Sequence, residues 1–490
     1  MAKPKKFDRN LIVIGAGSAG LVSAYIAAAI KASVTLVEAG PMGGDCLNTG
    51  CVPSKALIKC ARVAHGARQA ADFGVKLAEP EIDFPAVMRH VRSSIESIEP
   101  HDSVERYTGL GVDVVQGRAQ LVDPWTVKIR LNSGGERVLT ARAIVLATGA
   151  EPLVPPLPGL DQVDYVTSET LWQRFASLER APEKLVVLGG GAIGCELAQS
   201  FARLGSSVTL VEMAPRLLPA EDAEVSEAVE ESLSTEGVRV LTGCEATGFA
   251  PLEGGGGRVM VSDRSGETGL EFDQLLLALG RRPRVTGLGL EELGLVKDGH
   301  MLTDDFLRTE IGHILAAGDL VGPYQFTHMA SHQAWYAAVN GLFGDLKKFR
   351  VDYSLVPRAV FVDPEVASVG LSEHQASADG VPYTVTRYDL NDLDRAIVDG
   401  SARGFVKVLT VPGKDRILGA TIVGENAGEL IAEFVLAMKH GLGLNKLLGT
   451  IHIYPTMMEA NRFVAGNWKR AHAPQTILGL LERFHRWRRG

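Results

Sequence analysis

The sequence is poor in cysteine. Its 490 residues contain only five cysteines, which are Cys46, Cys51, Cys60, Cys195 and Cys244. This number excludes a small scaffold held together by disulfides, and it favours a reducing compartment. In such a chain, one particular pair of cysteines is more easily explained by chemistry than by structural cross-linking.

A long unbroken apolar run and an excess of positive charge are also missing. The apolar stretch at residues 11–30 is interrupted by Gly15, Gly17 and Gly20, so it predicts a strand, a turn and a helix. Residues 1–10 are basic but are followed by no cleavage site, so we expect no signal peptide, no transmembrane segment and a cytoplasmic location. The formal net charge of −8 argues against nucleic acid as the main partner.

Glycine and apolar residues, by contrast, are abundant. The 54 glycines and the hydrophobic content of 46% are typical of a globular α/β protein. A chain of 490 residues is too long for one hydrophobic core, and about two to four domains are expected.

The first motif is a dinucleotide-binding fingerprint. Residues 11–14 form a short apolar run that predicts a buried parallel strand. It leads into Gly15, Gly17 and Gly20, then an Ala-rich helix, and a second strand at residues 33–37 that ends in Glu38. The glycines allow the backbone to approach a pyrophosphate, and the carboxylate accepts a hydrogen bond from a ribose hydroxyl.

The same pattern occurs a second time. Residues 185–188 lead into Gly189, Gly191 and Gly194, and the strand at residues 207–211 ends in Glu212. Two fingerprints predict two dinucleotides, of which one can be a tightly held flavin. Glu212 favours NADH because its carboxylate repels the 2′-phosphate of NADPH, although Arg216 offers that phosphate a cation.

Further segments mark the limits of the nucleotide domains. Residues 138–149 predict a strand that ends in Ala-Thr-Gly, and the proline-rich residues 151–156 mark a crossing between domains. A similar strand and turn at residues 274–280 closes the inserted second domain. Residues 314–319 predict another buried strand that ends in Asp319, whose alternative role is that of a helix N-cap.

Cys46 and Cys51 lie five residues apart in the segment GGDCLNTGCVPSK, residues 43–55. In the first turn of a helix, free backbone N–H groups and the helix dipole stabilise a thiolate, so such a pair can form a reducible disulfide. The alternative roles for this cysteine pair are two ligands of a metal site or two buried apolar thiols. No second Cys/His pair at metal spacing lies nearby, so we expect no resident metal.

These motifs together resemble the flavin-dependent pyridine nucleotide–disulfide oxidoreductases, and in particular the members similar to mercuric reductase and dihydrolipoamide dehydrogenase. The resemblance covers residues 7–469. It rests on residues 43–55, both fingerprints, the strand ends at residues 147–149 and 317–319, and the late stretch HIYPTMME at residues 452–459. It implies an α/β fold with two Rossmann-like domains, for FAD and NAD(P), and a C-terminal α+β dimerisation domain.

The resemblance also implies roles for individual residues. FAD would be bound by Gly15, Gly17, Gly20, Glu38, Gly44, Thr148, Gly149 and Asp319. The nicotinamide nucleotide would be bound by Gly189, Gly191, Gly194 and Glu212, with Arg281 or Arg282 nearby. Cys51 would face the flavin, and Cys46 would attack the substrate. Lys55 and Glu196 would form an ion pair at the reactive edge of the flavin. The alternative for Lys55 is a solvated lysine on the surface of a helix.

The sequence departs from the disulfide reductases in its late motif. There the family carries a histidine before Pro-Thr, whereas this chain has Tyr454, while Glu459 keeps its place. A histidine with a pKa near neutrality exchanges protons with a dithiol, but a tyrosine, with an ordinary pKa of about 10, is a poor base at pH 7. His452 would share a face with Tyr454 in an extended segment, so it is either the base or a packed histidine.

A tyrosine at this place is similar to mercuric reductase, in which soft Hg(II) prefers thiolate ligands. A vicinal cysteine pair near the C-terminus and a cysteine-bearing N-terminal domain, both expected from that similarity, do not occur in this sequence. The acceptor therefore stays open between a small-molecule disulfide and a thiol-bound soft metal ion. Dihydrolipoamide dehydrogenase activity and a flavin-only quinone reductase or transhydrogenase are the alternatives.

The C-terminal part differs in pattern from the rest. Residues 359–361, 405–410 and 417–423 predict antiparallel strands, and residues 428–440 predict a helix. The corresponding domain of the family forms a homodimer whose late motif reaches the cysteine pair of the partner, so we expect shared active sites. Near the end, apolar residues recur at helical spacing among arginines, which predicts either a basic amphipathic helix at a membrane or partner, or a helix packed on its own dimer.

The expected domain limits follow from these segments. They are residues 1–155 and 281–350 for the two parts of the FAD domain, 156–280 for the NAD(P) domain, 351–470 for the dimerisation domain and 471–490 for the basic tail.

Overall fold

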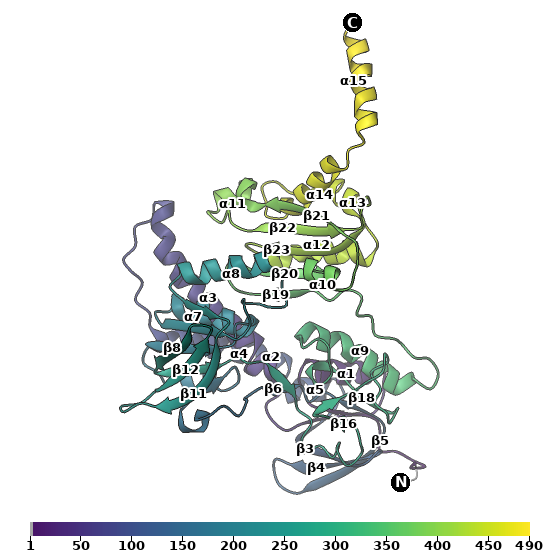
Figure 1. Ribbon diagram of the computed structural model, residues 1–490. Coiled ribbons are helices and arrows are strands. Elements are labelled where there is room, and N and C mark those ends of the chain that lie inside the picture. Colours follow the sequence, from purple (N-terminus) through teal and green to yellow (C-terminus); the bar gives the residue numbers. More distant parts are fainter. Residues whose placement is uncertain (1–2) are drawn as a thin grey trace. The chain divides into compact units, whose positions relative to one another are not determined.

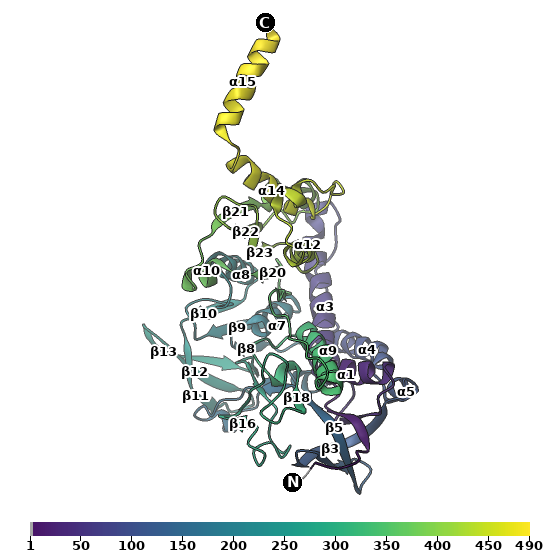
Figure 2. The ribbon, with the colours of Figure 1, turned by 90° about the vertical axis from the view of Figure 1, so that its right-hand side faces the viewer.

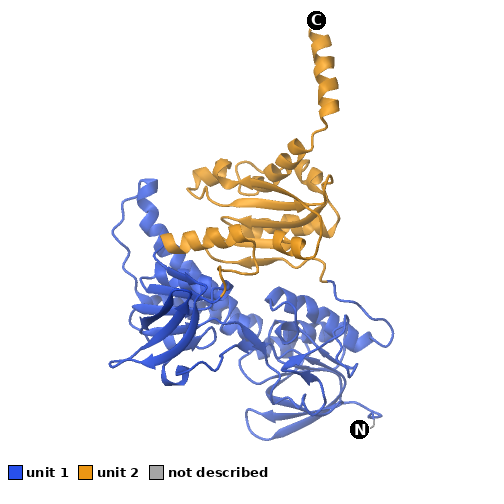
Figure 3. Cartoon of the chain, in the orientation of Figure 1, with its two compact units in different colours: residues 1–213, 236–352 blue, residues 214–235, 353–490 orange. Residues whose placement is uncertain are grey.

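The protein is described here from a computed structural model that covers residues 3–490 and groups them into two compact units (Figure 3). Unit 1 contains the residues up to Met213 together with Glu236–Asp352. Unit 2 contains Ala214–Thr235 and Tyr353–Gly490.

Unit 1 contains two parallel sheets, of which the first holds the first fingerprint (Figures 1 and 2). β1 pairs in parallel with β2 and β5, β2 pairs with β3, and β5 pairs with β18, while β3, β4 and β5 continue as an antiparallel meander. Its strands are β1 (Arg9–Ile14), β2 (Val34–Glu38), β3 (Asp113–Asp123), β4 (Thr126–Leu131), β5 (Glu136–Leu146) and β18 (Ile314–Ala316). Leu11, Ile12 and Val13 are fully buried, as expected for a parallel strand covered on both faces.

The second sheet of unit 1 holds the second fingerprint. Its order is β10-β9-β8-β14-β7, with every pair parallel. Its strands are β7 (Val166–Thr167), β8 (Lys184–Leu188), β9 (Ser207–Glu212), β10 (Arg239–Thr242) and β14 (Gln274–Leu277). An antiparallel sheet of β11 (Glu245–Pro251), β12 (Gly257–Asp263) and β13 (Gly266–Phe272) accompanies it, and two small ribbons pair β6 (Ala150–Pro152) with β15 (Arg281–Pro283) and β16 (Val296–Lys297) with β17 (His300–Met301).

The helices of unit 1 carry the chain between these strands. They are α1 (Ser18–Ala29), α2 (Gly44–Asn48), α3 (Cys51–Gln69), α4 (Phe84–Ile98), α5 (Val104–Gly109), α6 (Leu171–Phe175), α7 (Ala192–Arg203) and α9 (Thr327–Phe343). Short 3-10 helices are η1 (Ala70–Phe73), η2 (Glu99–His101), η3 (Leu160–Gln162) and η4 (Gly318–Leu320). α1 packs on α9, and α3 packs on α4 and α7.

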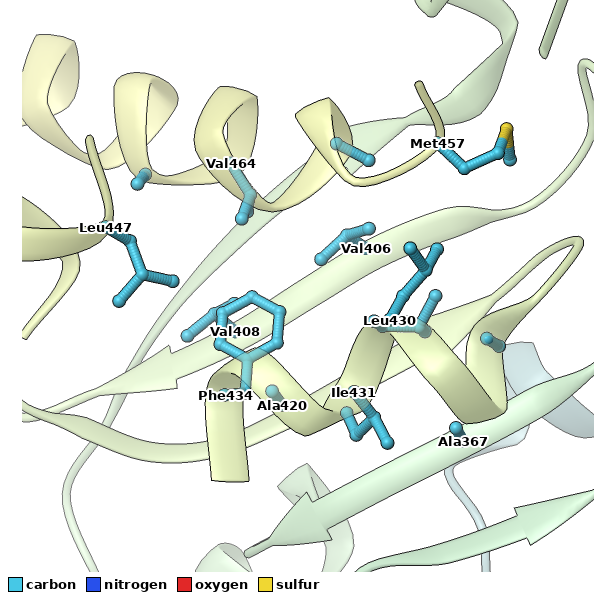
Figure 4. Packing of buried hydrophobic residues seen from close by; sticks show 14 of the residues in the cluster. Ala367, Val406, Val408, Ala420, Leu430, Ile431, Phe434, Leu447, Met457 and Val464 are labelled. Atoms are coloured by element: carbon cyan, nitrogen blue, oxygen red, sulfur yellow. The ribbon is translucent and has the colours of Figure 1, made fainter. Parts of the chain in front are cut away.

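Unit 2 is built on an antiparallel sheet with the order β19-β20-β23-β22-β21. Its elements are α8 (Ala223–Thr235), β19 (Arg358–Val360), β20 (Val366–Gly370), α10 (Glu373–Ala378), β21 (Thr384–Asp389), η5 (Leu390–Asp392), α11 (Asp394–Val398), β22 (Phe405–Thr410), β23 (Ile417–Val423), α12 (Ala427–Lys439), α13 (Leu444–Leu448), α14 (Glu459–Ala471) and α15 (Gln475–Arg489). Val406 and Val408 of the sheet, Phe434 of α12 and Val464 of α14 meet in one buried apolar cluster (Figure 4). Burial of such side chains stabilises the fold by about 1.5–3 kcal/mol each.

Unit 2 also contains a buried lysine. The Lys407 side chain on β22 is only 1% exposed, and its Nζ lies 2.7 Å from Asp222, 2.5 Å from Glu224 and 2.8 Å from Glu373. Burial opposes the charge of this lysine, but the three carboxylates outweigh it and raise the pKa of Lys407. Asp222 and Glu224 belong to the segment Ala214–Thr235, which therefore anchors to the sheet of unit 2.

The structure confirms the strands and helices predicted around both fingerprints and in the C-terminal part, with ends that differ by one or two residues. Two strands are shorter than predicted: the one expected over residues 138–149 ends at Leu146, and the one expected over residues 314–319 ends at Ala316. Residues 214–235 fall in the range predicted for the NAD(P) domain but are grouped with unit 2, so the predicted domain limits stay predictions. Among residues 3–490, no helix combines the length and the apolar character that a bilayer span requires.

Candidate functional site

The first fingerprint forms a tight turn between β1 and α1. Gly15 has a φ of +100°, and a Cβ atom at Gly20 would lie 1.7 Å from the Gly15 carbonyl oxygen, so only glycine fits there. At the end of β2, the Glu38 carboxylate accepts hydrogen bonds from the backbone N–H of Ala16 at 2.6 Å and of Gly40 at 2.7 Å. These contacts fix the carboxylate at the place that the fingerprint requires for a ribose.

A cavity of about 670 Å³ opens next to this turn. Its volume is that of a typical cofactor site. The predicted residues that line it are Gly15, Gly17, Glu38, Gly44, Thr148, Gly149 and Asp319. Gly44 has a φ of +60°, and a Cβ atom there would lie 2.6 Å from the Cα atom of Gly17, so the cavity wall depends on two glycines in contact. These residues fit a bound dinucleotide such as FAD.

Charged side chains gather at one part of the cavity wall. Arg284 lies 2.5 Å from Glu169, 3.7 Å from Asp45 and 3.9 Å from Glu151. Arg281 donates to Asp45 and to the Ala150 carbonyl oxygen, and it lies 3.8 Å from Glu169 and 3.9 Å from Asp319. We call this group of two arginines and four carboxylates the acidic cluster.

The positions of the two predicted arginines differ from expectation. Arg281 and Arg282 were expected beside the second fingerprint, but Arg281 reaches residues that line the first cavity. Arg282 pairs with Glu151 at 2.8 Å and has a side chain that is 61% exposed. The reason is that β15, which begins at Arg281, pairs with β6 directly after Gly149.

Asp319 lies in η4, at the cavity, and caps no helix by its side chain. Burial raises the pKa of its carboxyl group, against the opposing effect of Arg281. The expectation that Asp319 belongs to the flavin cavity agrees with this position, whereas the N-cap alternative does not.

The second fingerprint repeats the geometry of the first. Gly189 has a φ of +108°, and a Cβ atom at Gly194 would lie 1.8 Å from the Gly189 carbonyl oxygen. Gly191 is the N-cap of α7, and Glu212 accepts a hydrogen bond from the Gly190 backbone N–H at 2.5 Å. Arg216 donates to the carbonyl oxygens of Pro219 and Glu221.

Cys46 and Cys51 are brought together by a short loop. The two cysteines form no disulfide in the structure; Cys46 lies in α2 and Cys51 begins α3. Thr49 and Gly50 donate backbone hydrogen bonds to the Asp45 carbonyl oxygen, and the indole N–H of Trp172 donates to Thr49 at 2.7 Å. Cys46 lines the cavity, and Cys51 lies 3.3 Å from the Thr327 hydroxyl, which also lines it.

The two thiols differ in acidity. The hydrogen bond from Cys46, followed by that from Thr327 and by the charge of Lys55, lowers the pKa of Cys51 to about 6 against the effect of burial. The same contact with Cys51 raises the pKa of Cys46. At neutral pH, Cys51 is therefore the thiolate of the pair.

Lys55 and Glu196 form the predicted ion pair. Lys55 Nζ lies 2.9 Å from Glu196 Oε2, and the Glu196 side chain is 7% exposed. Lys55 lies on α3, one turn after Cys51, and Glu196 lies on α7, the helix of the second fingerprint. Packing of α3 on α7 thus connects the cysteine pair to that fingerprint.

The late motif lies in unit 2, and its two candidate bases point to different partners. The His452 side chain is 3% exposed, with Nε2 at 2.9 Å from Glu433 and Nδ1 at 3.0 Å from the Thr450 carbonyl oxygen. Tyr454 is 66% exposed and donates to Asp394 at 2.9 Å, which raises the pKa of Tyr454. The expectation of a shared face was wrong, because Glu433 of α12 draws His452 inward. Glu459 is buried at the start of α14.

Several residues around the cysteine pair and the cavity were not predicted. They are Asp45, Glu151, Glu169, Trp172, Arg284 and Thr327. Asp45 lies inside the segment of the cysteine pair, and Arg284 lies three positions after Arg281. Their closeness in the sequence to predicted site residues could therefore have identified them as site residues. The sequence around Glu169, Trp172 and Thr327 contains no signal of a role in the site, because only the folded chain brings these residues to it.

Comparison with known proteins identifies the family of the chain. The sequence pattern of the pyridine nucleotide-disulphide oxidoreductases matches residues 9–334, and that of their dimerisation domain matches residues 356–463. The chain belongs to this family. Its members use FAD and NAD(P)H, so the chain is a flavoprotein oxidoreductase with a redox-active disulfide. The dimerisation domain supports a homodimer, and the predicted fold class is confirmed.

Individual relatives carry different names. The chain is 37% identical to a mercuric reductase of Streptomyces lividans, over 93% of this chain and 95% of the relative. It is 34% identical to a dihydrolipoyl dehydrogenase of Chlamydia muridarum, over 92% and 94%. The HOCl-induced flavoprotein disulfide reductase RclA of Escherichia coli, solved as a Cu(II) complex, superposes with a TM-score of 0.81 at 27% identity, over 94% and 99%.

Proposed function

We propose that this flavoprotein oxidoreductase passes electrons from NADH through FAD to a Cys46–Cys51 disulfide, and from the resulting thiols to a thiol-bound soft metal ion. The observation that carries the proposal is the cysteine pair itself, at the cavity and at the start of α3, with Cys51 beside Thr327 and near the ion pair of Lys55 and Glu196. When bound, FAD takes up two electrons as a hydride from the nicotinamide and releases them to a disulfide.

The residues of the chain supply binding and charge. Glu38, the glycine turn and Asp319 hold FAD, and the second fingerprint with Glu212 holds NADH. A positive charge on Lys55 stabilises the Cys51 thiolate and negative charge at the reactive edge of the flavin. Glu212 disfavours NADPH because a carboxylate repels the 2′-phosphate.

The choice of acceptor rests on the absence of a ready base in the late motif. The His452 side chain is only 3% exposed, and its two ring nitrogens contact Glu433 and the Thr450 carbonyl oxygen, so both are occupied by partners within unit 2. Tyr454 is a poor base at neutral pH because the ordinary pKa of tyrosine is about 10, and the hydrogen bond to Asp394 raises the pKa of Tyr454 further. Oxidation or reduction of a dithiol requires proton transfer, whereas electron transfer to a metal ion held by thiolates does not.

The electrons balance for a metal acceptor. NADH becomes NAD⁺ by giving up two electrons and one proton. The two electrons reduce either one Hg(II) ion to Hg(0) or two Cu(II) ions to Cu(I). The names of the mercuric reductase relatives and the Cu(II) complex of RclA support this class of acceptor. The dihydrolipoyl dehydrogenase relative supports dihydrolipoamide as the competing substrate.

The test compares acceptors on the purified holoenzyme. We expect NADH oxidation that depends on Hg(II) or Cu(II) with excess thiol and falls on the order of 10³-fold in Cys46→Ser. Oxidation of dihydrolipoamide by NAD⁺ should be slower by at least about ten-fold and should rise in Tyr454→His. Faster turnover of dihydrolipoamide than of either metal would contradict the proposed acceptor.

The roles of the two cysteines are tested by absorption. A thiolate beside oxidised flavin gives a long-wavelength band, which we expect in reduced Cys46→Ser and not in Cys51→Ser. Persistence of the band in Cys51→Ser would reverse the two roles. Its absence from the wild type after anaerobic NADH titration would contradict the disulfide route altogether and leave the flavin-only route.

A further inference from the structure

The last helix, α15, is the one long helix of unit 2 that buries no residue. α14 ends where Trp468 stacks on His472, and α15 starts after Pro474. α15 is the C-terminal helix of the chain (Figures 1 and 2). Its six large apolar side chains are between 44% and 77% exposed; they are Ile477, Leu478, Leu480, Leu481, Phe484 and Trp487. A run of exposed apolar side chains of this size marks a surface that another molecule covers.

Most of the large apolar side chains of α15 lie on one face of the helix, and three of its four arginines lie outside that face. At 100° per residue, Ile477, Leu480, Leu481, Phe484 and Trp487 fall within one arc of about 120°. Arg483, Arg486 and Arg489 fall outside this arc, as does Leu478, whereas Arg488 falls inside it near the helix end. The long side chain of Arg488 can extend its charge beyond the apolar side chains around it.

The charge of this helix is opposite to that of the protein. α15 carries four arginines and a single acid, Glu482, which pairs with Arg486 at 3.0 Å, while the whole chain has a net charge of −8. Positive charge and exposed apolar side chains are therefore concentrated in the same fifteen residues. The complementary surface is negatively charged and has an apolar layer beneath its charges.

A second copy of the same helix fits this surface less well. Ile477, Leu480, Phe484 and Trp487 follow a coiled-coil spacing, but for only two repeats, which is too short for a stable pair. The positions that flank such a seam are Arg483 and Arg488, which would place like charges opposite each other in a parallel pair.

We propose that α15 binds the surface of a bilayer that contains anionic phospholipids. The helix lies in the plane of the interface, with its apolar face among the upper acyl chains and its arginines at the phosphates. Binding is reversible and weakened by salt.

The first experiment is sedimentation of the full-length holoenzyme with vesicles. We expect vesicles of phosphatidylcholine with phosphatidylglycerol to bind the protein at least about ten-fold more tightly than phosphatidylcholine alone, and the difference to shrink in high salt. Equal binding to both vesicles, or none to either, would overturn the proposal.

The second experiment uses variants that keep the helix. Each arginine near an anionic surface contributes about five-fold in affinity, so Arg483→Gln/Arg486→Gln/Arg489→Gln should lose about 100-fold. Leu480→Gln/Phe484→Gln should lose binding through the apolar face. The matched control is Arg89→Gln/Arg92→Gln on α4, where both arginines are also exposed, and we expect no change in that variant.

NADH oxidation should stay at the wild-type level in all these variants, which separates this proposal from the proposed function. Removal of residues 475–490 should abolish vesicle binding and leave the mass of the assembly at that of a dimer. A fall in the mass of the assembly on removal of the helix, with unchanged vesicle binding, would show that a second copy covers α15.

Discussion

The two dinucleotide fingerprints of unit 1 are nearly identical in backbone and differ in what surrounds them. Each has a glycine with φ near +100°, a later glycine that no side chain can replace, and a glutamate that accepts from a backbone N–H of the turn. The first turn faces a cavity with the acidic cluster in its wall. The helix of the second carries Glu196 to Lys55 and so to the cysteine pair. The glycine turn thus forms a nucleotide-binding site in both cases, and the side chains around each turn determine what the bound nucleotide can do.

The largest effect is expected from the same substitution made in each fingerprint. Gly20→Ala places a methyl group 1.7 Å from the Gly15 carbonyl oxygen and Gly194→Ala places one 1.8 Å from that of Gly189. Overpacking by about 3 kcal/mol corresponds to about 100-fold in affinity. We expect Gly20→Ala to be purified without flavin, and Gly194→Ala to keep its flavin but show a raised KM for NADH.

Flavin content by absorbance and steady-state kinetics measure these two results. If Gly194→Ala also loses its flavin, the fingerprints do not act on separate nucleotides and the comparison fails.

The next effect concerns the acidity of Cys51. The pKa of Cys51, at about 6, means that the thiolate is present above that pH and is lost as the pH falls through it. Lys55→Met removes a positive charge that lowers the pKa of Cys51, so the midpoint of the long-wavelength band of the reduced enzyme should move to higher pH. Glu196→Gln removes a negative charge that raises the pKa of Cys51, so this substitution should move the midpoint to lower pH. Titration of this band with pH measures both shifts.

Lys59→Met is the control for Lys55→Met, since Lys59 lies one turn further along α3 and is exposed. A midpoint that moves equally in the control, or that does not move in Lys55→Met, would show that the ion pair does not act on Cys51.

A smaller effect is expected in the acidic cluster. Its four carboxylates outnumber its two arginines beside the cavity expected to hold a pyrophosphate. Asp45→Asn removes one negative charge, so FAD should bind to the apoprotein about five-fold more tightly, as measured by quenching of flavin fluorescence. Asp164→Asn is the control, because Asp164 also pairs with an arginine but is 84% exposed. Weaker binding in Asp45→Asn would mean that Asp45 acts mainly by holding Arg281.

The smallest effect is expected at Glu212. Glu212→Gln keeps an acceptor for the Gly190 backbone N–H but removes the charge that repels a 2′-phosphate. The ratio of kcat/KM for NADPH to that for NADH should rise a few-fold, on the order of 1 kcal/mol. An unchanged ratio would assign the cofactor preference to other residues.

The elements around both fingerprints could be predicted because their signals are local. Apolar runs such as residues 11–14 and glycines at fixed spacing specify strand, turn and helix without knowledge of the rest of the chain. Lys55 and Glu196 were paired only through a family resemblance, since 141 positions separate them in the sequence.

Other features depended on tertiary packing and could not be predicted. Arg281 reaches Asp45 across 236 positions because β15 pairs with β6, and nothing in either segment indicates that pairing. His452 turns away from Tyr454 because Glu433 of α12 is placed beneath it. In both cases a charged partner from a distant element determines where the side chain points.

The segment Ala214–Thr235 has a consequence for any attempt to divide the molecule. Because the chain enters unit 2, returns to unit 1 and enters unit 2 again, no single cut yields either unit complete. A fragment that starts at Tyr353 would contain Lys407 in its sheet without Asp222 and Glu224. During synthesis, unit 2 is therefore complete only after strands that follow its first helix, α8, by more than a hundred residues.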